Sequence, residues 1–227
     1  MEPTRESAAD QPEPIIIVLP NGSLQANCYL MLCPNTREAI VVDPGAEPER
    51  LLAAIASAGA RVKKVVHTHG HFDHIGATEA VLAGLPERVP VAGHLADAYL
   101  YDRAARVQGV ALGYPLPQML VAPDETLTDG AQLRVGDLCI EVIATPGHTP
   151  GSVSLRAGGV LLSGDTLFHR GIGRTDLPGG DEDQIYTSIL TRLYPLPEAL
   201  RVLPGHGPET TIGAERRLNP FVQALEQ

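Results

Sequence analysis

The segment HTHGHFDH, residues 67–74, contains four of the eight histidines in the chain, together with one aspartate. It follows the short strand pattern RVKKVV and has the spacing H-x-H-x-D-H, formed by His69, His71, Asp73 and His74. Neutral imidazole and carboxylate are good ligands for zinc, iron and manganese. A turn can aim several side chains at one point, whereas a continuing strand would alternate them between opposite faces. The segment therefore predicts a metal-binding turn rather than a polar surface turn.

Three further turns repeat this arrangement, each with one polar residue after an apolar strand pattern and beside glycine. TPGHTPGS contains His148, LLSGDTLF contains Asp165, and VLPGHGP contains His206. Each of these turns alone would be a weak signal. Ligands gathered at one end of a sheet would produce this order along the chain, so the four turns together predict one shared site.

The elements that would position these turns are strands and helices that interleave along the chain. Apolar runs predict strands within 14–20, 27–33, 38–45, 61–66, 89–93, 131–147, 151–157, 159–165 and 199–205. Helical patterns cover 47–59, 76–85, 95–107 and 182–193, and a short helix closes the chain. Residues 109–129 contain three prolines and predict a long loop. We predict a disordered tail over residues 1–14 and a single α/β domain over residues 15–227.

Composition excludes several classes of protein. The chain has 227 residues, 44% of them hydrophobic, so it can bury a full core. A net charge of −10 with 17 scattered basic residues argues against a nucleic-acid partner. We see neither an apolar run of membrane-spanning length nor a signal-peptide pattern. Three cysteines without framework spacing indicate free thiols in a reducing cytoplasm, and we place Cys139 in the core.

Taken together, these motifs resemble those of the metallo-β-lactamase superfamily. The resemblance rests on H-x-H-x-D-H, the histidine of TPGHTPGS, SGDTLF and PGHGP, and it covers nearly the whole chain from about Ile15. Within the superfamily, GIGRTDLPGGD and LPGHGPETTIGAERRLNPF are similar to the short, single-domain, glyoxalase II-like proteins of bacteria. This resemblance implies a four-layer αβ/βα sandwich with metals at one edge of its two sheets.

The resemblance also implies two divalent metal ions, most simply zinc, although iron and manganese accept the same ligands. The matching positions are His69, His71 and His148 for the first metal, Asp73, His74 and His206 for the second, and Asp165 as the bridge between them. Asp43 in VVDPG matches a carboxylate that lies behind the ligands and orients them. A turn-capping aspartate would have the same sequence context.

The activity implied by the resemblance is hydrolysis. Two metals about 3.5–4 Å apart can hold a hydroxide at neutral pH, which attacks a carbonyl, and a metal then stabilises the oxyanion. Asp73 has two possible roles, as a ligand and as a catalytic proton acceptor that orients the nucleophile. No residue outside the ligand set stands out as a general acid. Because thiols have a pKa near ~8.5, a thiolate leaves without a proton, which favours thioesters over amides.

The substrate contacts are less defined. Arg174 in GIGRTD matches a basic residue with which glyoxalase II contacts glutathione, and it could clamp a substrate carboxylate in a bidentate pair. The other interpretation is a structural pair with Asp176, which stands where the family usually has an aromatic residue. Only 21 residues follow His206, so we expect no C-terminal helical domain of the kind found in full-length glyoxalase II.

We therefore expect a cytoplasmic binuclear hydrolase of small-molecule thioesters resembling hydroxyacylglutathione. The main rival is a persulfide dioxygenase, a mononuclear iron enzyme that shares the fold and a similar GRTD stretch. A second rival is a lactonase that uses the same metals. Secreted zinc β-lactamases are disfavoured, because they place a cysteine in the region of Asp165. A non-catalytic scaffold would have little use for seven intact ligand positions.

Overall fold

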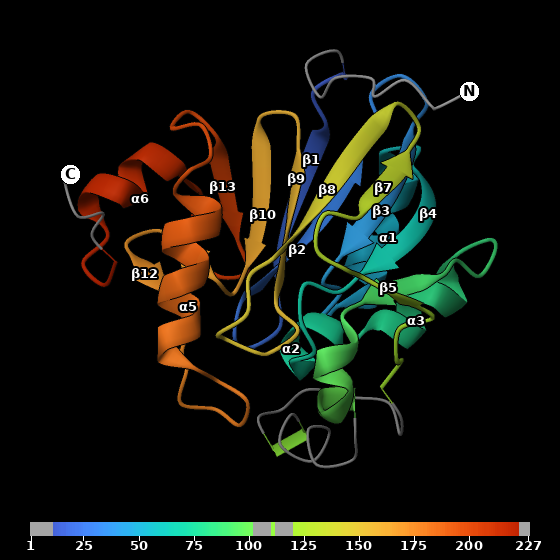
Figure 1. Ribbon diagram of the computed structural model, residues 1–227. Coiled ribbons are helices and arrows are strands. Elements are labelled where there is room, and N and C mark those ends of the chain that lie inside the picture. The colour runs from blue at the N-terminus through green and yellow to red at the C-terminus, as the bar shows by residue number, and fades with distance from the viewer. Residues whose placement is uncertain (1–10, 102–109, 112–119, 223–227) are drawn as a thin grey trace, which may run out of the picture.

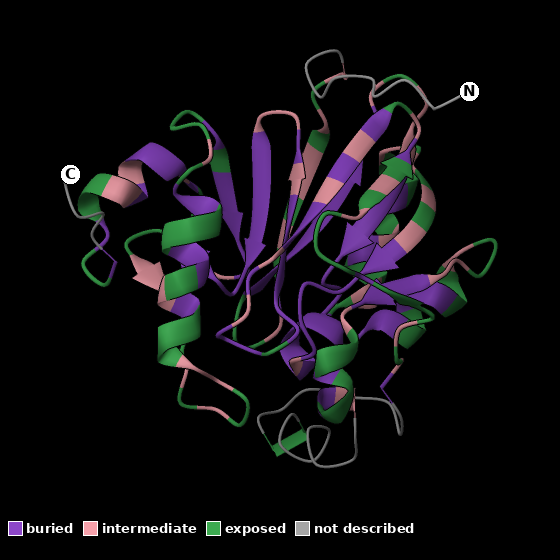
Figure 2. Ribbon diagram, viewed as in Figure 1, coloured by how far each residue is buried: buried purple, intermediate pink, exposed green. Residues whose placement is uncertain are grey.

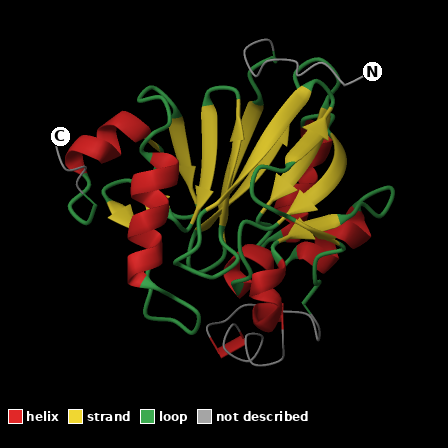
Figure 3. Cartoon of the chain, viewed as in Figure 1, coloured by secondary structure: helices red, strands yellow, loops and turns green. Residues whose placement is uncertain are grey.

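Two six-stranded sheets form the centre of the protein in the computed structural model (Figures 1 and 3), which describes residues 11–101, 110–111 and 120–222. The first sheet has the order β1 (Ile15–Asn21), β2 (Ala26–Leu32), β3 (Glu38–Val42), β4 (Arg61–Val66), β5 (Val91–Gly93) and β6 (Glu125–Thr126). The second has the order β14 (Thr210–Thr211), β13 (Arg201–Pro204), β10 (Val160–Gly164), β9 (Val153–Ala157), β8 (Leu138–Ala144) and β7 (Gln132–Val135). A small hairpin pairs β11 (Leu167–Phe168) with β12 (Gly171–Ile172).

Helices cover the outer face of each sheet. On the first sheet these are α1 (Pro48–Ser57) and α3 (Thr78–Gly84). On the second they are α5 (Glu182–Ser188), its π-helical continuation η2 (Ile189–Leu193), and α6 (Ile212–Leu218). Two short elements, α2 (Phe72–Ile75) and the 3-10 helix η1 (Leu95–Tyr101), lie near the sheet edge. The layers run helix, sheet, sheet, helix, which confirms the predicted αβ/βα sandwich.

Strand β2 shows why the sheets are buried on both faces. Tyr29 and Met31 point into the core between the sheets, whereas Leu30 and Leu32 point toward α1 and α3. Since successive strand residues face opposite sides, a strand covered on both faces needs a continuous apolar run, and NCYLMLC supplies it. Figure 2 shows the buried residues concentrated along the strands.

Strand direction brings the predicted turns to one edge of the sandwich. Strands β3, β4 and β5 are parallel, and β10 is parallel to β13. Strand β9 runs antiparallel to both β8 and β10, so β8 shares the direction of β10. The carboxyl ends of β4, β8, β10 and β13 therefore carry the four ligand turns, and α2 and the turn after β8 lie close together in Figure 1.

Three local expectations are revised by the structure. The predicted helix 95–107 is a 3-10 helix over Leu95–Tyr101, and residues 102–107 lie outside the described residues. Within the predicted loop 109–129, β6 pairs with β5, although residues 109 and 112–119 are not described. Placing Cys139 in the core was wrong: Leu138, Ile140 and Val142 occupy the buried face of β8, so alternation turns Cys139 to the other face, where it is half-buried.

The predicted tail joins the domain before β1 begins. Residues 1–10 lie outside the described residues. Gln11 accepts a hydrogen bond from the Cys139 amide at 2.7 Å, and the carboxylate of Glu13 accepts one from the Gly159 amide at 2.9 Å. Among the described residues, none of the helices is both long and apolar enough to cross a membrane.

Candidate metal centre

The H-x-H-x-D-H segment changes conformation within the motif. Strand β4 ends at Val66, and His69 lies in the turn that follows. His71 is extended, with φ −70° and ψ 142°, directly before α2 begins. Asp73 and His74 are then on the first turn of α2. A turn followed at once by a helical turn brings these four side chains to one side of the chain.

The other three turns meet this segment from the second sheet. His148 lies in the turn between β8 and β9, Asp165 directly follows β10, and His206 comes two residues after β13. His148 and Asp165 are buried, and the His206 side chain is 28% exposed. The structure thus brings all seven predicted ligands together at the junction of the two sheets.

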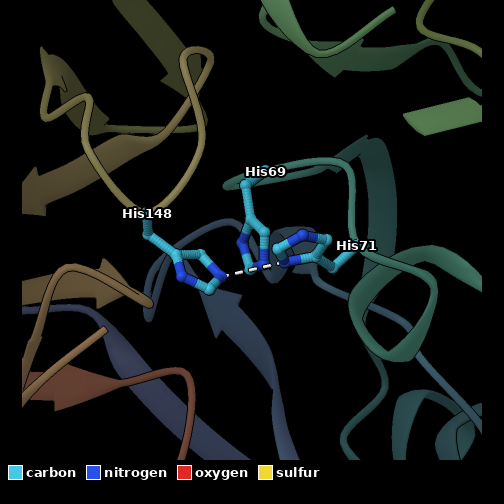
Figure 4. A group of neighbouring side chains, drawn as sticks. All are labelled: His69, His71 and His148. Carbon is cyan, nitrogen blue, oxygen red and sulfur yellow. Dashed lines mark hydrogen bonds between the residues drawn. The ribbon is translucent and has the colours of Figure 1, made fainter. Parts of the chain in front are cut away.

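Three histidines form a first ligand group, which Figure 4 shows with the rings turned toward one another. His69, His71 and His148 each offer a ring nitrogen, and these atoms lie within 4.8 Å of one another. His71 Nδ1 is 2.9 Å from His148 Nε2. His69 Nε2 is buried without a hydrogen-bond partner. A buried ring nitrogen without a partner is costly unless something that is absent from the protein chain binds it.

A second ligand group lies beside the first and includes one carboxylate. His74 Nε2 is 3.3 Å from His206 Nε2. Asp73 Oδ2 is 3.3 Å from His206 Nε2 and 3.6 Å from His74 Nε2. These three ligand atoms also lie within 4.8 Å of one another.

Asp165 lies between the two groups. Its Oδ2 is 3.5 Å from His148 Nε2 in the first group and 3.6 Å from His206 Nε2 in the second. Its Oδ1 is 3.5 Å from His74 Nε2 and is buried without a hydrogen-bond partner. This is the position that a bridging carboxylate requires.

The separations between ligand atoms fit metal binding. Two ligands at about 2.0–2.1 Å from a tetrahedral zinc ion lie roughly 3.3–3.4 Å from each other. The His71–His148 separation is 2.9 Å, and the three separations within the second group run from 3.3 to 3.6 Å. Together with the unpartnered atoms of His69 and Asp165, this spacing indicates that the residues can hold divalent cations.

Contacts behind the ligands fix the direction of the histidine rings. The Nδ1 of His74 donates to Asp43 Oδ2 at 3.0 Å, and that of His148 donates to the carbonyl of Arg174 at 2.7 Å. The Nδ1 of His206 donates to the carbonyl of Leu24 at 3.0 Å. A ring that donates outward from Nδ1 keeps the lone pair of Nε2 toward the centre. The sequence did not indicate the two carbonyl acceptors, because any residue type supplies a carbonyl.

Asp43 combines both of the roles that its sequence allowed. It is buried after β3 with φ 54°, a strained backbone conformation for an aspartate. Its carboxylate accepts hydrogen bonds from the Thr68 amide at 2.7 Å and the Thr68 hydroxyl at 2.6 Å, which secures the turn after β4. It also orients His74. Because the Thr68 hydroxyl donates to Asp43, its oxygen can accept from His69 Nδ1 at 3.1 Å, so Asp43 supports both ligand groups.

Electrostatics distinguish the two groups in the absence of a cation. Burial and the neighbouring His148 lower the pKa of His71 to about 3, and burial holds the pKa of His69 well below its usual range. Burial also disfavours charge on His74, but Asp165 and Asp73 outweigh it and raise the His74 pKa to about 10. His69 and His71 are therefore neutral, whereas His74 holds a proton that a metal ion would replace.

Arg174 lies at the edge of the metal centre, and its side chain turns toward Asp176 in the same loop. Its side chain is 61% exposed, and its guanidinium forms two hydrogen bonds of 2.7 Å to the carboxylate of Asp176. This is the pair expected in the structural interpretation. The substrate clamp stays a prediction.

A four-layer sandwich with histidine and carboxylate ligands at one edge of both sheets defines a metal-binding protein of the αβ/βα class. The family model described as "Metallo-beta-lactamase superfamily" matches residues 21–206. The chain belongs to the metallo-β-lactamase superfamily, as the sequence motifs predicted. The superfamily and the ligand cluster together indicate a metallo-hydrolase that uses divalent metal ions.

Two relatives match this chain over almost their whole length. The probable metallo-hydrolase YqgX of Bacillus subtilis is 37% identical over 211 residues, which are 91% of this chain and 97% of YqgX. The hydroxyacylglutathione hydrolase GloC of Haemophilus influenzae is 34% identical over 212 residues, which are 92% of this chain and 98% of GloC. The predicted likeness to hydroxyacylglutathione hydrolases is therefore confirmed.

Three solved structures share the fold of this chain over most of its length. The BLEG-1 B3 metallo-beta-lactamase has a TM-score of 0.83 at 38% identity, over 92% of this chain and 100% of that one. TTHA1623 in a di-iron-bound form has a TM-score of 0.79 at 38% identity, over 93% and 100%. ETHE1 from Myxococcus xanthus has a TM-score of 0.75 at 31% identity, over 91% and 83%. These three solved structures share the fold of this chain, and one of them is in a di-iron-bound form.

Proposed function

We propose that the protein hydrolyses thioesters of the hydroxyacylglutathione type at a centre of two divalent metals. The observation that carries this proposal is the second ligand group, Asp73, His74 and His206, placed beside Asp165. A mononuclear site of two histidines and one carboxylate would be complete without these side chains. The likeness to GloC of Haemophilus influenzae supports the choice of thioester.

Each group of ligands would hold one of the two metal ions. His69, His71 and His148 would hold the first ion, and the second group the other, with Asp165 shared. When bound, such ions make water nucleophilic at neutral pH and polarise a carbonyl. Burial disfavours charge on Asp73, but His74 and His206 outweigh it and hold the Asp73 pKa well below its usual range. Asp73 is therefore anionic and can orient a water as well as bind metal.

The leaving group favours the same substrate class. A thiolate needs no proton to leave at neutral pH, because thiols have a pKa near ~8.5. An amide nitrogen must be protonated as its bond breaks, which requires an acid placed on the leaving-group side. The side chains that converge on this centre are neutral imidazoles, ion-paired imidazoles and carboxylates, which suit ligation and water activation better than that task.

A second candidate is a persulfide dioxygenase, favoured by the GRTD stretch at residues 173–176, which is similar to that of those enzymes. The two activities separate in one set of assays. We expect S-lactoylglutathione to release free thiol under nitrogen, faster than a lactone or a cephalosporin is opened. Oxygen uptake on glutathione persulfide without anaerobic thiol release would favour the dioxygenase. Ring opening faster than thiol release would point to a lactonase or a β-lactamase.

Replacing Arg174 tests whether this residue, at the edge of the metal centre, binds the glutathione part of the substrate. If its guanidinium binds a carboxylate of glutathione, Arg174→Ala should raise KM for glutathione thioesters by about tenfold, with a smaller change in kcat, as expected for loss of uniform binding. Because the pair with Asp176 is exposed, we expect Tm to change little.

Asp176→Ala is the matched control for Arg174. It breaks the same pair but leaves the guanidinium free for substrate, so KM should stay unchanged or fall. A lower Tm in Arg174→Ala with an unchanged KM would assign Arg174 to structure alone.

A further inference from the structure

Asp97 on η1 is a buried carboxylate outside the ligand set. It is 1% exposed, and three neutral groups donate hydrogen bonds to it. Its Oδ2 accepts from the Gly70 amide at 2.9 Å and from the Thr149 hydroxyl at 2.8 Å, and its Oδ1 accepts from the Gly151 amide at 2.7 Å. Burial raises the pKa of Asp97, so its charge depends on all three donors.

These three donors belong to the two turns that supply the first ligand group. Gly70 lies between His69 and His71, and Thr149 directly follows His148. The two turns come from different sheets, after β4 and after β8. One carboxylate thus joins the backbones whose side chains must meet at 2.9 Å.

The backbone of both turns packs directly on η1. A Cβ added to Gly70 would lie 2.9 Å from the Leu100 Cβ, and one added to Gly151 would lie 2.6 Å from the Asp97 Cγ. Both distances are shorter than side chains tolerate. The glycines therefore permit the close approach that lets Asp97 reach both backbone amides.

The geometry points to Asp97 as a positioning residue for the first metal site: it holds the His69–His71 turn and the His148 turn at the separation that a shared ion requires. The second group depends on other supports, namely Asp43 behind His74 and the Leu24 carbonyl behind His206. Loss of Asp97 should therefore affect the first metal selectively. This inference rests on the metal centre of the proposed function but not on its thioester substrate.

Asp97→Asn is the variant of choice, because it keeps the shape of the side chain. A carboxamide accepts at only one of its two outer atoms, so its NH₂ must face the Gly70 amide or the Gly151 amide. Outer contacts of this kind typically change metal affinity by about 10–100-fold. We expect the first metal to be released at roughly 10–100-fold lower chelator concentration, with the second metal unaffected. Titration with Co²⁺ distinguishes the two sites, because a site of three histidines and one carboxylate absorbs differently from a site of two histidines and two carboxylates.

Glu215 on α6 provides a matched control. It is also 1% exposed and accepts from three neutral donors, the Arg170 amide, the Thr210 hydroxyl and the Asn219 amide group. Glu215→Gln should lower Tm but keep both metals at wild-type affinity. In metal-free protein, backbone amides of 68–72 and 147–151 should exchange hydrogen faster in Asp97→Asn than in Glu215→Gln.

Wild-type affinity for the first metal in Asp97→Asn would overturn the inference, as would equal weakening of both metals. If Asp97→Asn does not fold, Thr149→Val tests the inference instead. This variant removes the hydroxyl that donates to Asp97 and leaves the two donating backbone amides in place. A smaller but selective loss at the first site supports the role of Asp97, and unchanged binding refutes it. A wild-type protein that binds no metal would overturn the centre itself, an outcome recognisable without any variant.

Discussion

Replacing His71 or His148 with alanine is expected to remove the first metal and nearly all hydrolytic activity. Each residue supplies one of the three ring nitrogens of the first group, and the facing atoms of these two lie 2.9 Å apart. The two remaining histidines and the shared Asp165 would hold the first cation poorly. A catalytic metal supplies several kcal/mol of transition-state stabilisation, and about 1.4 kcal/mol changes a rate tenfold, so kcat/KM should fall by about 10³-fold or more.

Elemental analysis and thioester hydrolysis, measured on the same preparations, check this expectation. His169→Ala is the matched control, because His169 is exposed in the turn between β11 and β12. It should retain wild-type metal content and activity. Wild-type metal content in His71→Ala or His148→Ala would contradict the ligand assignment.

Asp165→Asn is expected to weaken the second metal at least about 100-fold. The asparagine keeps the shape of the side chain but removes the charge from a position within 3.6 Å of histidines in both groups. Two cations held side by side repel each other, and a carboxylate between them offsets that repulsion. A pair of unit charges 4 Å apart interacts by about 4 kcal/mol at an intermediate effective dielectric constant, so one lost charge has a large effect.

A metal titration of Asp165→Asn, monitored by calorimetry, measures the loss of affinity for the second metal. Asp129→Asn removes a carboxylate of the same type from the exposed pair with Arg192 and serves as the control. It should bind two ions as the wild type does. Two tightly bound metals in Asp165→Asn would show that Asp165 does not bridge.

The positions of the proposed ligands could be predicted from the sequence because the four segments that carry them each follow an apolar strand. His148, Asp165 and His206 share that context, and the carboxyl ends of strands with a common direction meet at one edge. The long strands and most helices were predictable for a similar reason, since burial on one face leaves a periodic apolar pattern and burial on both faces of a strand leaves a continuous apolar run. Two-residue strands such as β11 and β14 are too short to leave one.

Apart from Asp43, which the family resemblance indicated, the supports behind the ligands could not be predicted from the sequence. Asp97 lies in a segment with an ordinary helical pattern, and only its burial and its contact with Thr149, 52 positions away, reveal its function. Thr68 is one residue from a ligand, but its hydroxyl matters only because Asp43 lies opposite. Contacts between distant segments depend on the packed fold, so no local spacing encodes them.

The number of metal ions that the activity requires tests the central claim most directly. Metal-free protein would be titrated with zinc under nitrogen while thiol release from S-lactoylglutathione and bound metal are both followed. The two ligand groups around Asp165 predict binding of two equivalents, with full activity only as the second is taken up. Full activity at one equivalent would contradict the two-metal centre, and so would an enzyme active only with one iron ion and oxygen.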